Sequence, residues 1–179
     1  MSRLHTIAAA EATGQTAELF AAIRKAVGKV PNAYLTIGSN APAVLANVLQ
    51  TGALLQKNST LSAREVEAIN LAVSEASACD YCVAAHTLTG KMAGYSAEQT
   101  RELRAGAYAE DGKIDALVRF ALTLVKTSGT LPAGAVDAVR AAGYTDRQIV
   151  ESIQAVSAIL FTNMFNRVND TVVDFPKVA

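Results

Sequence analysis

The sequence has no tryptophan and few aromatic residues of any kind, with 5 Tyr and 5 Phe among 179 residues. Hydrophobic residues nevertheless make up 51% of the chain, so alanine and aliphatic side chains must supply most of the packing. Such a mixture favours closely packed helices over a β-sandwich. A chain of this length can bury one sizeable core, and we expect a single domain over residues 1–179.

An excess of either charge is also absent, because 16 Lys and Arg balance 16 Asp and Glu. No basic stripe with interleaved aromatic residues is present, which argues against a nucleic-acid partner. The N-terminal residues lack the apolar core and cleavage site of a secretory signal, so we expect a cytoplasmic protein. The longest apolar stretch, at 155–165, contains three polar residues and falls short of the ~20 residues that span a bilayer, which argues against a membrane span.

Helix start and stop signals divide the chain into about eight helices, and no segment shows the sustained period-two alternation of a strand. The sequence therefore predicts an all-α, multi-helix bundle. Capping-box spacings at Ser62, Ser96 and Thr145 mark three helix starts. We expect helices over about 14–27, 42–56, 63–77, 79–92, 97 onward, 113–127, 132 onward and 146–165, with an extended segment at 30–32.

The chain has only two cysteines, Cys79 and Cys82, and they lie three positions apart. In a reducing compartment such a pair more often serves redox chemistry or metal binding than permanent cross-linking. His86 follows Cys82 at i,i+4, so all three side chains approach one face of a helix. Two cysteines at this spacing in a first helical turn can close a disulfide with little strain, which predicts a reversible dithiol.

A thiolate is the reactive species, and a nucleophilic cysteine needs something to lower its pKa from about 8.5. His86 can do this for Cys82, as a base or as an imidazolium partner. The helix N-terminus does it better for Cys79, which lies nearer the free backbone N–H groups. We weigh the specific partner above a helix-dipole effect of about 0.3–1 kcal/mol and predict Cys82 as the nucleophile.

Glu67 completes the predicted site. It lies on a helix whose neighbouring run, residues 69–73, is apolar almost all round, as expected of a buried helix. A buried carboxylate without a partner would have a raised pKa, which suits an acid that relays protons near neutral pH. We predict Cys82, Cys79, His86 and Glu67 as the catalytic residues, in a core at about 62–94, with no cofactor and no metal.

The spacing of these four residues resembles the core motif of the alkylhydroperoxidase D family, within the carboxymuconolactone decarboxylase-like superfamily. A glutamate is followed by a cysteine twelve positions on (79 − 67), a second cysteine three later (82 − 79) and a histidine four beyond (86 − 82). The segments Val30-Pro31-Asn32 and 166–169 are similar to the peroxidase-related branch of that family. Tyr81 departs from the best-known members, which carry a histidine there as part of a longer proton relay.

The resemblance implies an all-helical fold that assembles into trimers or hexamers. It also implies that Cys82 reduces a hydroperoxide, that Cys79 resolves the product, and that a dithiol protein, lipoyl-bearing or thioredoxin-like, regenerates the pair.

Three other interpretations stay open. Cys79, Cys82 and His86 could bind a metal, with His5 or Glu67 as the fourth ligand, or the pair could belong to a redox-responsive oligomer without peroxidase activity. Alternatively, Glu67 and His86 could be the acid and base of a decarboxylase or isomerase. Glu67 taken alone could also be a surface charge paired with Arg64.

Structural roles are expected for five further polar or aromatic residues: Glu75, Tyr81 and the asparagines at 163, 166 and 169.

Overall fold

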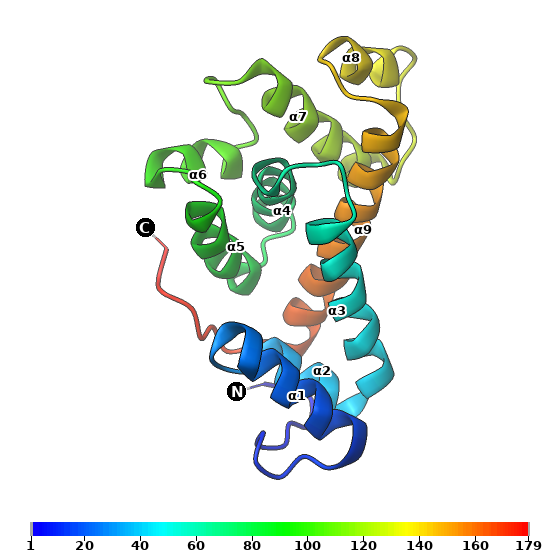
Figure 1. Ribbon diagram of the computed structural model, residues 1–179. Coiled ribbons are helices and arrows are strands. Elements are labelled where there is room, and N and C mark those ends of the chain that lie inside the picture. The colour runs from blue at the N-terminus through cyan, green and yellow to red at the C-terminus, as the bar shows by residue number, and fades with distance from the viewer. Residues whose placement is uncertain (1, 179) are drawn as a thin grey trace.

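The computed structural model describes residues 2–178, which form nine α-helices and no strand (Figure 1). The predicted all-α class is confirmed, with one helix more than the roughly eight expected. The helices are α1 (Gly14–Val27), α2 (Asn32–Asn40), α3 (Pro42–Lys57), α4 (Ala63–Ala76), α5 (Asp80–Met92), α6 (Ala97–Arg104), α7 (Gly112–Thr127), α8 (Ala135–Ala141) and α9 (Asp146–Asn169).

The additional helix is α2, and it begins within the segment that was expected to be extended. Pro31 is extended, with φ −58° and ψ 147°, but it is the N-cap of α2 and its carbonyl accepts a hydrogen bond from Leu35 N. The extended geometry therefore ends at Pro31. Helix α8 begins later than expected, at Ala135 instead of Pro132, because Gly134 at its N-cap has a left-handed φ of 80°.

The three capping boxes are present. Each N-cap hydroxyl accepts a hydrogen bond from the backbone N–H of the residue three positions on. The side chain of that Glu or Gln in turn accepts a hydrogen bond from the N-cap N–H. These reciprocal bonds satisfy donors that a helix start otherwise leaves unpaired. The starts of α4, α6 and α9 are thereby fixed by local sequence, as the spacing predicted.

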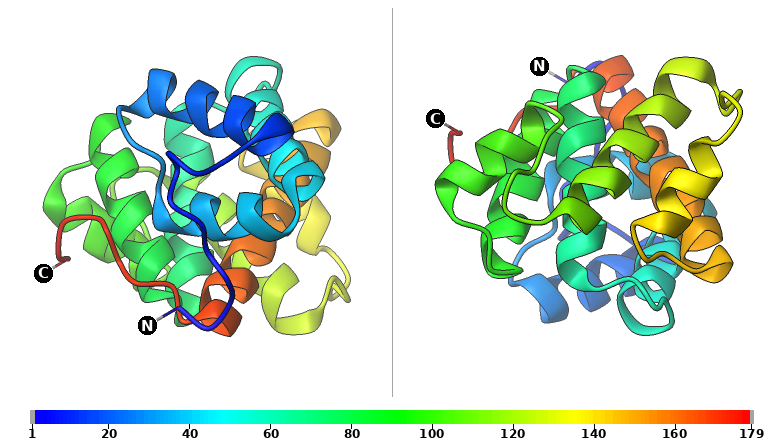
Figure 2. Two further views of the ribbon diagram at one scale, coloured as in Figure 1. Left: turned by 90° about the horizontal axis from the view of Figure 1, so that it is seen from below. Right: turned by 90° about the horizontal axis from the view of Figure 1, so that it is seen from above.

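Helix α4 lies at the centre of the molecule and packs against α5, α6, α7 and α9 (Figure 2). Its apolar residues Ile69, Leu71 and Val73 are fully buried although they point in different directions around the helix. A helix that is apolar on nearly every side is stable only inside a bundle. Polar side chains on α4 are therefore held against neighbouring helices, and Glu67 faces α5.

The N-terminal segment, from residue 2 on, contacts the end of α9, where the C-terminal segment begins. Asn169 accepts hydrogen bonds from the backbone N–H groups of Arg3 and Leu4. After α9 the chain runs past the start of α5 (Figure 1), where Asp174 accepts a hydrogen bond from the hydroxyl of Tyr81. No helix within residues 2–178 combines the length and the apolar character needed to cross a membrane.

Candidate active site

The turn between α4 and α5 sets the position of Cys79. Ala78 has a left-handed φ of 50°, its N–H donates to Glu75 O at 2.9 Å, and the N–H of Cys79 donates to Ser74 O at 3.0 Å. This pair of bonds is a Schellman motif, which ends a helix and reverses the chain. Cys79 is then the N-cap of α5, where its sulfur accepts a hydrogen bond from Cys82 N at 3.3 Å.

The two thiols are free and buried, and they lie within one helical turn of each other. A hydrogen bond from the Cys82 thiol, helped by the backbone N–H of Cys82, lowers the pKa of Cys79 to about 7 against the opposing effect of burial. The same hydrogen bond and burial raise the pKa of Cys82. Near neutral pH the reduced pair therefore carries its negative charge on Cys79, with Cys82 as the donor.

Glu67 forms an ion pair with His86, whose Nδ1 lies 2.9 Å from Glu67 Oε2. Thr89 Oγ1 donates to the same oxygen at 2.7 Å and Asn70 Nδ2 to the other at 3.3 Å. Burial raises the pKa of Glu67, but the charge and hydrogen bond of His86, with those two donors, outweigh it and hold the pKa below its usual value. The raised pKa expected for an unpartnered carboxylate is therefore wrong, because this carboxylate has partners.

The alternative pairing of Glu67 with Arg64 does not occur. Arg64 donates instead to the carbonyl of Gly94 and to the hydroxyl of Tyr108. The Glu67–His86 pair is partly exposed, with side-chain exposures of 16% and 23%. The pair thus joins α4 to the middle of α5 near the surface, whereas the thiols are buried at the start of α5.

The four predicted residues gather along α4 and α5, although His86 does not bond a sulfur directly. Over residues 2–178, no hydrogen bond joins His86 to Cys79 or Cys82. His86 lies one helical turn after Cys82, and its charge contributes to the lowered pKa of Cys79. The same range contains no group of three or more His, Cys, Asp or Glu side chains that could hold a metal ion.

Two asparagines of α9 reach the site, although the sequence predicts them as satisfied amides at a helix or subunit contact. Asn166 Nδ2 donates to Cys82 Sγ at 3.3 Å, and Asn163 Nδ2 donates to Ser74 Oγ at 3.2 Å. Within the described part of the chain, neither amide oxygen has a hydrogen-bond partner, although both are buried. The signal that could have found them is the row of amides at i,i+3 on an otherwise apolar helix, since a buried amide needs a polar partner.

The expected structural roles of Glu75 and Tyr81 agree with their contacts. Glu75 forms an ion pair with Arg104, with Arg104 Nε 2.7 Å from Glu75 Oε2. The Tyr81 ring packs edge-on against Phe175, and its hydroxyl donates to Asp174. Tyr81 therefore ties the start of α5 to the C-terminal segment.

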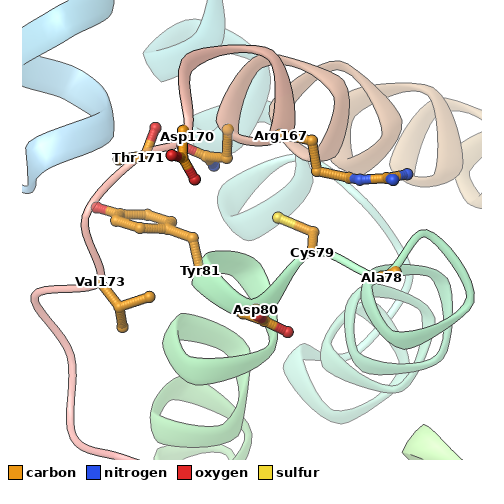
Figure 3. Close-up of a pocket in the computed structure, with 9 residues that line it drawn as sticks. Ala78, Cys79, Asp80, Tyr81, Arg167, Asp170, Thr171 and Val173 are labelled. Atoms are coloured by element: carbon orange, nitrogen blue, oxygen red, sulfur yellow. The ribbon is translucent and has the colours of Figure 1, made fainter. Parts of the chain in front are cut away.

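A pocket of about 320 Å³ opens beside Cys79. Figure 3 shows Cys79 between the first turn of α5 and the last turn of α9, with its sulfur pointing into the space that Tyr81 and Arg167 flank. Cys82 and His86 do not line this pocket. The lining residues are Ala78, Cys79, Asp80, Tyr81, Asn166, Arg167, Asp170, Thr171 and Val173.

Comparison with known proteins agrees with the motif and the fold. The model of the carboxymuconolactone decarboxylase family matches residues 42–125, which include all four predicted site residues. This segment is similar to the carboxymuconolactone decarboxylase family, and the chain as a whole has the AhpD-like fold. The AhpD-like fold extends well beyond the matched segment, as solved structures show, whereas no curated protein matches the chain.

Three of these structures illustrate how widely the AhpD-like fold is shared. An AhpD-core, peroxidase-related protein from Ralstonia eutropha JMP134 has a TM-score of 0.87 at 21% identity, over 97% of this chain and 92% of that one. A peroxidase-related protein from Silicibacter sp. TM1040 has a TM-score of 0.78 at 20% identity, over 96% and 94%. The debrominase Bmp8, solved with 2,3,4-tribromopyrrole, has a TM-score of 0.78 at 16% identity, over 97% and 92%.

Proposed function

We propose that this protein is a thiol-dependent peroxidase that reduces hydroperoxides through the redox pair Cys79 and Cys82. The observation that carries the proposal is the geometry at the start of α5, where Cys79 is the N-cap and its sulfur accepts a hydrogen bond from Cys82 N at 3.3 Å. Hydrogen bonds from Cys82 lower the pKa of Cys79 to about 7. A thiol with this pKa is substantially ionised at neutral pH, and a second thiol within hydrogen-bonding reach can close a disulfide with it.

The structure supports an order of events opposite to the one that the sequence predicted. Cys79 carries the resting charge and lines the pocket, so we propose that its thiolate attacks the distal peroxide oxygen. The O–O bond breaks, Cys79 becomes a sulfenic acid, and the leaving alkoxide takes a proton to become an alcohol. Cys82 then attacks the Cys79 sulfur, which releases water and forms the disulfide. First attack by Cys82 stays a prediction that the single-cysteine variants can test.

Glu67 and His86 act in this proposal as the proton relay. The Cys82 thiol must lose its proton when it condenses with the sulfenic acid, and burial together with the neighbouring Cys79 raises its pKa. His86, one turn further along α5, is the nearest general base on the same helix face. Glu67 would hold the imidazole in orientation through the 2.9 Å contact and stabilise its protonated form.

The cycle needs an external dithiol to return the pair to the reduced state. A lipoyl-bearing or thioredoxin-like protein would supply it by thiol–disulfide exchange, in the reducing cytoplasm that the sequence predicts.

Assembly into a homo-oligomer, a trimer or a hexamer, belongs to the same proposal. Five large apolar side chains of α9 are more than one-third exposed, and they recur mostly at spacings of three and four residues. Their burial between subunits would remove a long apolar stripe from water. Sedimentation equilibrium tests this, since a monomer at micromolar concentration would contradict it. The residues are Val150, Ile153, Phe161, Met164 and Val168.

Free-thiol titration under denaturing conditions tests the function. Reduced protein treated with one equivalent of cumene hydroperoxide should lose both thiols, and a dithiol reductant should restore them. In the proposed order, Cys82→Ser still consumes one equivalent of peroxide and stops at a sulfenic acid, whereas Cys79→Ser consumes almost none. The reverse pattern would return the first attack to Cys82, and retention of both thiols in the wild type would refute the peroxidase.

A second candidate rests on the Glu67–His86 pair itself, which is intact and partly exposed. A carboxylate and an imidazole in contact can serve as acid and base in a decarboxylation or isomerisation of a small carbonyl acid. That chemistry does not need the thiols. Turnover of such an acid by a variant with both cysteines replaced by serine would favour it over the peroxidase.

A further inference from the structure

The two sulfurs of the site have different surroundings, and this difference determines how a disulfide between them would be reduced. Cys79 lines the pocket beside the last turn of α9 (Figure 3), whereas Cys82 is not among the residues that line it. Thiol–disulfide exchange needs in-line access to one sulfur, and the other sulfur departs as a thiolate. Both cysteines are almost fully buried, but Cys79 is the one that lines the pocket. An external thiol that enters the pocket would therefore attack Cys79, and Cys82 would be the leaving group.

Burial makes Cys82 a poor leaving group unless something stabilises its charge. Its sulfur accepts a hydrogen bond from Nδ2 of Asn166 at 3.3 Å, and a weaker hydrogen-bonding influence of the Asn163 amide also lowers the pKa of Cys82. Asn166 is held in place from both sides, because its backbone carbonyl accepts a hydrogen bond from Thr171 N and the next side chain, Arg167, donates to Ser77 O. Its amide is therefore fixed on the sulfur before charge develops there.

The amide of Asn166 is costly for the fold. Asn166 is 5% exposed, and its Oδ1 is buried without a hydrogen-bond partner among the described residues. A leucine of similar volume would leave no acceptor unpaired, so stability alone would favour an apolar side chain here. The donated N–H on Cys82 is the one interaction that a leucine could not make.

From this juxtaposition we infer that Asn166 is a catalytic residue of the reductive half of the cycle, where it stabilises the Cys82 thiolate as the leaving group when an external thiolate attacks Cys79. The inference rests on the proposed function only in requiring that the pair forms a disulfide.

The electrons and bonds of the step balance. The thiolate of an external dithiol forms a bond to Cys79 Sγ, the Cys79–Cys82 bond breaks, and its electron pair goes to Cys82 Sγ beside the Asn166 amide. The second thiol of the donor then displaces Cys79, which leaves the donor oxidised to a disulfide and the pair reduced. Cys82 takes up a proton and returns to donating its hydrogen bond to the Cys79 thiolate.

Two variants and one control test the inference without peroxide. Protein oxidised with diamide is mixed with excess dithiothreitol in a stopped-flow instrument, and its unfolding is followed in urea. Asn166→Leu should slow the reduction by about tenfold to a hundredfold, as expected for the loss of a hydrogen bond to a charged sulfur, while the fold stays at least as stable. Asn166→Asp keeps the shape of the side chain and replaces the donor with an acceptor, so its disulfide should be reduced more slowly still. This variant tests the inference if Asn166→Leu does not fold.

The control is Thr87→Val on α5, since Thr87 Oγ1 is also buried without a partner but bonds no sulfur. It should gain stability and keep the wild-type rate of reduction. An unchanged rate in a folded Asn166→Leu variant would overturn the inference.

The site of attack gives a second readout. Oxidised wild-type protein treated with glutathione and quenched in acid should carry the mixed disulfide on Cys79, and an adduct on Cys82 would overturn the inference. If diamide closes the disulfide but peroxide is not consumed, only the proposed peroxidase function is refuted. If diamide cannot close the disulfide, the peroxidase function and the inference about Asn166 are both refuted.

Discussion

The two ends of the candidate site are built in different ways. At the start of α5, main-chain hydrogen bonds position Cys79 through a Schellman motif and an N-cap bond. Side-chain amides of α9 lie against the buried pair of cysteines. One turn further on, Glu67 and His86 are held by side-chain contacts near the surface. Charge at the first end should therefore depend on the identity of one hydrogen-bond donor, and charge at the second on an ion pair that pH can remove.

Replacing Cys82 gives the largest effect and tests the first end directly. Both Cys82→Ser and Cys82→Ala should strongly slow turnover with a dithiol, because the disulfide between Cys79 and Cys82 cannot form and the donor must reduce a buried Cys79 sulfenic acid directly. The pKa of Cys79 should nevertheless differ between them: the serine hydroxyl can still donate a hydrogen bond and keep the pKa near the wild-type value of about 7, whereas alanine should let it rise toward about 8.5. Thiolate absorbance against pH measures this, and equal values in the two variants would mean that the side-chain donor is not what lowers the pKa.

Glu67→Gln tests the second end. Loss of the carboxylate should slow disulfide closure by about tenfold to a hundredfold, since the imidazole loses its orienting partner, while alkylation of Cys79 should change little. If alkylation slows as much as closure, the two ends do not act separately.

The same variant has a pH signature in stability. The pKa of Glu67 lies below its usual value in the fold, so its charge stabilises the native state above about pH 4.3 and this contribution is lost as pH falls through the folded pKa. Urea denaturation should show Glu67→Gln less stable than wild type by about 1–3 kcal/mol at about pH 7, with the difference shrinking at about pH 3. A difference that persists in acid would indicate lost packing instead.

Local signals in the sequence predicted much of this architecture, because they act over a few residues. The capping boxes at Ser62, Ser96 and Thr145 begin helices where expected, and the i,i+4 spacing brings His86 within a turn of Cys82. The signals failed where the outcome depends on contacts distant in sequence. Nothing near Asn166 reveals that it bonds a sulfur 84 positions away.

The charge on each thiol could not be predicted for a related reason. His86 was expected to act on Cys82, yet its ring nitrogen bonds Glu67, 19 positions earlier on another helix. The dominant influence on Cys79 is the neighbouring thiol itself, and which of two thiols donates depends on the geometry of the turn that precedes α5.

That turn offers the smallest of the expected effects. Ala78 is exposed and has a left-handed φ of 50°, which costs an alanine about 1–2 kcal/mol and a glycine almost nothing. Glycine also makes the unfolded chain more flexible, which offsets about 0.4–1 kcal/mol of the gain. Ala78→Gly should therefore stabilise the protein by up to about 1 kcal/mol and leave the pKa of Cys79 unchanged, as urea denaturation and thiolate absorbance would show.

Ala76→Gly is the matched control, because Ala76 is an exposed alanine two residues earlier in right-handed helix. This substitution should destabilise the protein by about 0.5–1 kcal/mol. If both glycines destabilise equally, the backbone at position 78 is not left-handed in solution, and the support that the Schellman motif gives to Cys79 would be lost with it.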